Sequence, residues 1–121
     1  MKLVADILVI VVALLHTYFL VLEMFLWDKP KGLKTFGNTP EKAAITKVLA
    51  ANQGLYNGFL AAGLLVGLWM GDAGFAFKVY FLLCVVVAGV YGAATVSKRI
   101  LYIQAVPAAL ALGLVWLSAV K

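Results

Sequence analysis

Few residues of this chain carry side chains that could do chemistry, and most of these stand inside long apolar runs. The chain has one histidine, His16, and one cysteine, Cys84, so a CxxC redox pair or a thiolate metal cluster within one chain is excluded. Glu23 follows His16 by about two helical turns, or about 10.5 Å along a helix axis, which is too far for one shared metal ion. We therefore assign no metal ligand and no catalytic residue, and the sequence names no cofactor.

The polar side chains in the apolar runs could instead hydrogen-bond to a ligand. His16 and Glu23 differ by about 20° around a helix and so share one face. The polar positions between residues 52 and 57 span an arc of about 140° on the second run. Such groups are costly in a membrane and usually turn inward. The predicted ligand-binding residues are His16, Glu23, Asn52, Gln53, Tyr56, Asn57, Tyr91 and Gln104.

A structural interpretation of the same residues stays open beside the functional one. Asn, Gln and Tyr side chains hydrogen-bond between membrane helices, and each such pair contributes about 0.6 kcal/mol on average. For Glu23 and His16 together we favour a ligand or proton site. We expect Glu23 to face the inside of a bundle, with Asn52 or Gln53 as its nearest amide partner on the second helix.

The composition indicates which class of protein positions these groups. Hydrophobic residues make up 65% of the 121 residues and charged residues 12%, with a mean hydropathy of +1.06. Soluble domains average about 45–50% apolar and about 25% charged residues. These values exclude a water-soluble globule, a disordered chain and a disulfide-rich secreted domain. The net charge of +5 comes from scattered basic residues, which form no stripe for nucleic-acid binding.

Four apolar runs predict an all-α polytopic membrane protein, because about 20 apolar residues cross the hydrocarbon core as a helix. The predicted spans are residues 3–27, 48–70, 76–97 and 100–119, with a basic loop at 28–40. We expect them to form four transmembrane helices in an antiparallel bundle, as one domain over residues 1–121. Thr39 and Pro40 resemble an N-cap followed by proline at the first helical position.

The distribution of cations predicts the orientation. The loop, the start of the second helix and the connection at residues 97–99 carry seven Lys and Arg residues, whereas the opposite side carries three. The positive-inside rule places the seven-cation side in the cytoplasm. We therefore expect a multi-pass protein of the inner (plasma) membrane with both termini extracytoplasmic. Asp6 and Lys78 should then lie near each other, about one turn inside the outer surface.

Small residues form two ridges on the second run. Gly54, Gly58 and Ala62 share one face, and Gly63 and Gly67 share another. Such ridges let helix backbones approach closely. One ridge suffices for packing inside a bundle, so the second is a candidate surface for a homo-oligomer. The expected partners are membrane lipids and a second copy of the chain, with no nucleic acid.

Two segments give the chain a family resemblance. HTYFLVLEMFLW at residues 16–27 and NQGLYNGF at residues 52–59 resemble the small bacterial membrane proteins known as Domain of Unknown Function 1304. The resemblance covers essentially the whole chain and is most specific in NQGLYNGF. It implies four transmembrane helices and supplies no activity.

Three functional hypotheses follow from these residues. The first is a binding module for a lipid-like or small amphipathic ligand, held in a polar pocket of the inner leaflet. The second is a small proton-coupled exporter that uses Glu23 as a membrane-embedded carboxylate, by analogy of size and layout with small multidrug transporters. The third is an intramembrane isomerase or hydrolase with His16 and Glu23 as acid and base. We favour the first over the two alternatives.

Overall fold

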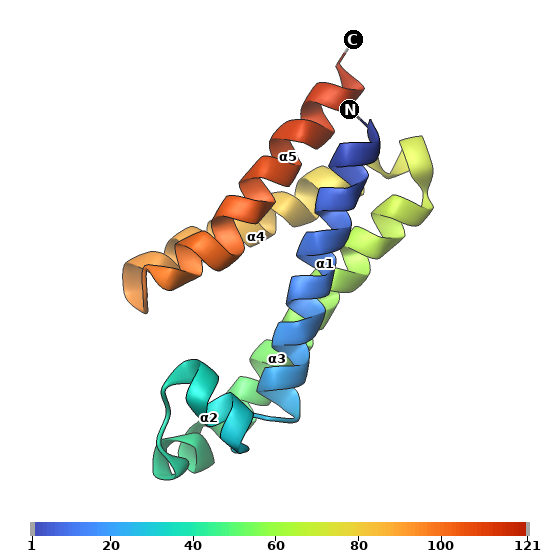
Figure 1. Cartoon of the computed structure of the whole chain (residues 1–121). Helices are drawn as coiled ribbons and strands as arrows, with labels where there is room; N and C mark the ends of the chain where they lie inside the picture. The colour runs from blue at the N-terminus through green and yellow to red at the C-terminus, as the bar shows by residue number, and fades with distance from the viewer. Residues whose placement is uncertain (1, 121) are drawn as a thin grey trace. The chain divides into compact units, whose positions relative to one another are not determined.

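The structure, a computed structural model, describes residues 2–120, and all regular elements in this range are helical (Figure 1). The α-helices are α1 (Lys2–Met24), α2 (Pro30–Phe36), α3 (Pro40–Trp69), α4 (Phe75–Thr95) and α5 (Val106–Ala119). A 3₁₀ turn η1 (Gly71–Gly74) precedes α4, and a π-helical turn η2 (Leu101–Ala105) precedes α5. The all-α prediction is confirmed.

Three helical stretches of the described chain are long and apolar enough to cross a membrane: Lys2–Met24, Gly71–Thr95 and Leu101–Ala119. These stretches indicate a membrane protein. Helix α3 has 30 residues and is about 45 Å long, so its length suffices. Its polar residues between positions 52 and 57 lower its hydropathy below that of the other three. Four spans in an antiparallel bundle therefore stay a prediction.

The segment predicted as a loop at residues 28–40 contains the short helix α2, which the sequence reading missed. Pro30 lies in its first turn, where a missing N–H costs nothing. Gly37 ends the helix with a φ of 66°, a left-handed conformation that glycine adopts without strain. The turn-forming residues that indicated a loop thus act as the two ends of a helix.

The structure divides into two compact units, one with residues up to 14 and from 60 onward, the other with residues 15–59. The first unit has an apolar core in which Gly63 packs against the ring of Phe81 and Gly67 against the stem of Lys78. The buried core residues of this unit are Ala5, Val9, Val12, Ala13, Leu64, Leu82, Val85, Ala108, Ala111 and Val115.

In the second unit, the remaining parts of α1 and α3 pack through small residues. Gly54 and Gly58 lie against Leu20 and its neighbours on α1. Both glycine ridges of α3 therefore have a neighbour inside the chain, and the homo-oligomer stays a prediction. At the α2 end of the unit, the indole N–H of Trp27 donates to Thr46 Oγ1 at 3.0 Å.

Candidate functional site

The centre of the candidate site is a buried hydrogen bond between α1 and α3. Asn57 Nδ2 donates to Glu23 Oε1 at 2.5 Å, and the two residues are only 8% and 6% exposed. Gly54 lies one turn before Asn57, and an added Cβ there would lie 3.1 Å from the Glu23 Cβ. The absence of a side chain at Gly54 thus lets the two helices approach closely enough for this bond.

The predicted contact of Glu23 with this helix is confirmed, but the predicted amide partner is wrong. Asn57 is the partner, whereas Asn52 and Gln53 are exposed. The expected depth of these residues in the membrane indicated the correct helix and the correct region of it. It could not fix which amide faces α1, because that depends on the rotation of α3. Gly54 and Asn57 are three residues apart and share one face of the helix, so their spacing could have indicated Asn57 as the partner of Glu23.

His16 lies deeper in the same unit, about two turns before Glu23 on α1. Its side chain is fully buried, and its ring meets that of Phe19 edge to face, with centroids 5.2 Å apart. His16 and Glu23 thus remain on one face of α1, as their spacing predicted.

The other predicted residues of α3 form an exposed strip, here called the amide strip, which comprises Asn52, Gln53 and Tyr56. Tyr56 is 60% exposed, and its ring lies 6.0 Å from that of Phe59. At 100° per residue the three side chains fall within an arc of about 100°. The predicted cluster on α3 is thus divided into a buried Asn57 and the exposed amide strip.

Tyr91 and Gln104 belong to the other compact unit. Tyr91 is 70% exposed on α4, and its carbonyl accepts a hydrogen bond from the Thr95 hydroxyl at 2.7 Å. Gln104 is half-buried within the π-helical turn η2. Among the described residues, no group of three or more His, Cys, Asp and Glu side chains could hold a metal ion.

An ion pair lies within the second unit, next in sequence to the hydrogen bond of Trp27 with Thr46. Lys47 Nζ lies 3.0 Å from Asp28 Oδ2, and both side chains are partly exposed. The hydrogen bond from Lys47 holds the pKa of the Asp28 carboxyl below its usual range. Together, the two side-chain contacts join the connection between α1 and α2 to the first turns of α3.

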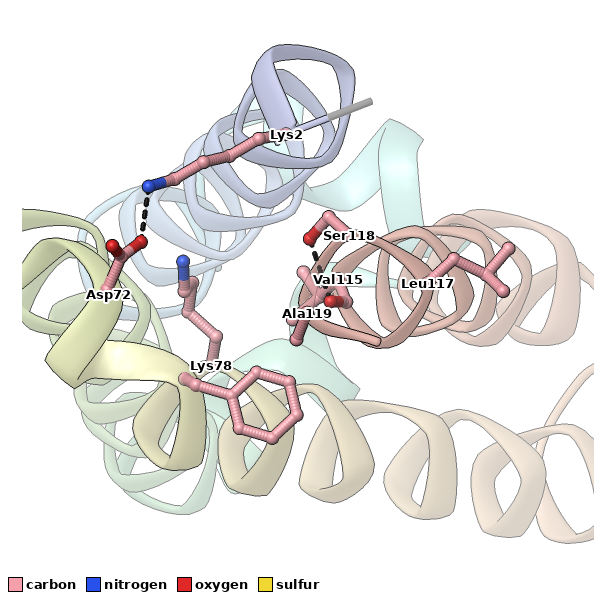
Figure 2. Close-up of a pocket in the computed structure, with 8 residues that line it drawn as sticks. Lys2, Asp72, Lys78, Val115, Leu117, Ser118 and Ala119 are labelled. Carbon is pink, nitrogen blue, oxygen red and sulfur yellow. Dashed lines mark hydrogen bonds and ion pairs between the residues drawn. The ribbon is translucent and has the colours of Figure 1, made fainter. Parts of the chain in front are cut away.

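The first unit contains a pocket that was not predicted from the sequence. It has a volume of about 780 Å³ and contains charged groups from α1, η1 and α4 (Figure 2). Lys78 Nζ lies 3.5 Å from Asp6 Oδ1, which confirms the predicted proximity of these two residues, and Lys2 pairs with Asp72. The residues that line the pocket are Lys2, Asp72, Phe75, Lys78, Val115, Leu117, Ser118 and Ala119.

Apolar helices of spanning length with buried polar contacts define a helical membrane protein. The family model "Protein of unknown function (DUF1304)" matches residues 10–116, and the chain belongs to this family. The "Uncharacterized protein YpaA" of Lactococcus lactis subsp. lactis (strain IL1403) is 30% identical over 114 residues, which cover 93% of this chain and 96% of that relative. No solved structure matches. The resemblance seen in the sequence is thus confirmed.

Proposed function

We propose that the protein is a four-span membrane protein that binds a neutral lipid-like molecule along the amide strip of α3. The observation that carries this proposal is the exposure of Asn52, Gln53 and Tyr56 within residues 48–70, a stretch without a charged side chain. In hydrocarbon a polar side chain needs a hydrogen-bonding partner. A bound head group at the strip would supply one.

The chemistry of the strip favours an uncharged head group. Each amide offers both a donor and an acceptor, and the Tyr56 hydroxyl does the same. None of these groups compensates a formal charge, so hydroxyl or amide head groups fit better than phosphates or carboxylates. The ring contact between Tyr56 and Phe59 adds an apolar surface for an acyl chain. A monoacylglycerol has both parts.

A fourth span through α3 is supported by the ion pair of Lys2 with Asp72. Lys2 begins α1 and Asp72 lies in η1, so both ends of the intervening chain lie at one membrane surface. A chain that crosses through α1 must therefore cross back before Asp72. Among the described elements, α3 is the only helix of spanning length between Met24 and Gly71. Four spans place both termini on one side, which the charge distribution assigns to the outside.

Reporter fusions test this topology. We expect alkaline phosphatase fused after residue 121 to be active, and the same reporter inserted after Asn38 to be inactive, because the enzyme folds only outside the cytoplasm. A fluorescent protein that folds in the cytoplasm should give the reverse pattern at the two positions. Equal reporter activity at residue 121 and after Asn38, which would place both on one side of the membrane, would contradict four spans.

Binding of a fluorescent monoacylglycerol to the purified protein in detergent tests the ligand. We expect Gln53→Leu and Tyr56→Phe to weaken binding about 5- to 10-fold each, because each removes hydrogen bonds of about 1 kcal/mol. Tyr80→Phe is the matched control, since Tyr80 is 62% exposed on α4 and also contacts a phenylalanine ring. Equal losses in all three variants, or none, would contradict a site at the amide strip.

Proton-coupled export is a second candidate, and the burial of Glu23 favours it. The Glu23 carboxylate accepts a hydrogen bond from the neutral amide of Asn57, a setting in which a carboxyl can take up and release a proton. Export would make monoacylglycerol binding pH-dependent in the native chain and pH-independent in Glu23→Gln. The enzyme hypothesis is not favoured, because the observed partner of Glu23 is an amide, which is neither an acid nor a base.

A further inference from the structure

We propose that the pocket of the first unit binds the phosphodiester group of a phospholipid through Lys78 and Lys2. The pocket shares no residue with the amide strip, so a test of this site is independent of a test of the proposed function. Its volume of about 780 Å³ lies within the range of about 300–1,000 Å³ typical of small-molecule sites.

The Lys78 ammonium is buried and only loosely paired. The residue is only 6% exposed, yet it lines the pocket, and Figure 2 shows its ammonium group directed into the space between Asp72 and α5. Its ionic partner, Asp6 Oδ1, lies at 3.5 Å, beyond the usual 2.7–3.2 Å of a hydrogen bond. That oxygen is buried and has no hydrogen-bond partner among the described residues. The ammonium therefore has donors to give to a group in the pocket.

The charge of the lining suits a phosphodiester. The lining residues Lys2, Lys78 and Asp72 sum to one positive charge, and the carboxylate of Asp6, 3.5 Å from the Lys78 ammonium, brings the group to neutrality. A phosphodiester, with one negative charge, is therefore less costly to hold between these two cations than a phosphate monoester, which carries nearly two at neutral pH. Lys2 is exposed at the rim, and Lys78 lies within. The two lysines can thus approach one phosphate from two sides.

The position of the pocket and its apolar walls suit a lipid. It lies where α1 and α4 begin and α5 ends, which are ends of the three candidate spans. Lipid head groups lie at this level of a membrane. Phe75, Val115 and Leu117 add apolar surface for the adjoining acyl chains. A phospholipid supplies both the anion and the chains, so it fits better than a free anion.

Titration calorimetry of the full chain in a non-ionic detergent tests the proposal. The probes are a short-chain phosphatidylglycerol, diacylglycerol with the same chains, and glycerophosphoglycerol, which is the same phosphodiester without chains. We expect phosphatidylglycerol to bind at least tenfold more tightly than either of the others. Diacylglycerol binding equally well would overturn the role of the phosphate. Glycerophosphoglycerol binding equally well would show a site for a free anion and overturn the proposal of a lipid.

Two variants locate the binding site. The double variant Asp6→Leu/Lys78→Met removes the buried ion pair as a unit and should weaken phosphatidylglycerol binding at least tenfold. Ser118→Leu should do the same by filling the pocket without removing a charge. Asp28→Asn/Lys47→Gln, which removes an ion pair away from the pocket, is the matched control and should leave the affinity unchanged. Full affinity in Ser118→Leu, or an equal loss in the control, would overturn the site.

Discussion

Gly74→Ala is expected to lower the free energy of unfolding by about 3 kcal/mol, at the upper end of the usual cost of overpacking. An added Cβ would lie 1.9 Å from the carbonyl oxygen of Gly67, an atom of the α3 backbone. Unlike a flexible side chain, this oxygen can move only if the turn between α3 and α4 moves. Thermal unfolding of the detergent-solubilised protein, followed by circular dichroism, measures the effect.

Gly113→Ala is the control for this prediction. An added Cβ at Gly113 meets no atom within 4 Å. Because alanine is about 0.5–1 kcal/mol better than glycine inside a helix, this variant of α5 should be as stable as the native chain or slightly more so. Equal melting temperatures for the Gly74 and Gly113 variants would contradict a close approach of backbones at the turn.

The pair formed by Asp6 and Lys78 gives the second large expected effect. Lys78→Met should destabilise the protein by about 2–3 kcal/mol, because it leaves a carboxylate without its cation. Full burial would make the cost of a broken pair about 3–5 kcal/mol, but the Asp6 side chain is 32% exposed. Asp6→Leu should cost a similar amount, because the Lys78 side chain is only 8% exposed.

The double variant Asp6→Leu/Lys78→Met should recover most of this loss, since apolar replacement of both partners in a buried pair is often neutral. Chemical unfolding of the two single variants and the double variant gives the coupling energy. Simple addition of the two single losses in the double variant would show that the two side chains contribute independently. Lys47→Met is the control, because its exposed ion pair with Asp28 should contribute little.

Two kinds of contact could be predicted from the sequence: helix caps and charged pairs at one membrane depth. Thr39 was predicted to cap α3, and its Oγ1 accepts a hydrogen bond from the backbone N–H of Lys42 at 3.2 Å. The pairing of Asp6 with Lys78 was also predictable, because both are costly charges at one expected depth. Local capping chemistry and membrane depth are properties that one sequence carries by itself.

Contacts that depend on how helices rotate against each other could not be predicted in the same way. The choice of Asn57 over Gln53 as the partner of Glu23 depends on which face of α3 meets α1. The pocket of the first unit is built from segments at both ends of the chain, such as Lys2 and Ser118, so no local pattern indicates it. Periodicity places a residue on a face, but packing decides what that face meets.

The bond between Asn57 and Glu23 also bears on how the chain enters a bilayer. On the proposed topology, α3 is the least apolar of the four crossing helices, and it would partition poorly from the translocon into lipid by itself. Helix α1 carries the carboxylate that Asn57 binds, and it is synthesised first. If the two helices leave the translocon as a preformed hairpin, Glu23 and Asn57 are hidden from the acyl chains. We therefore expect α3 to depend on α1 for its insertion.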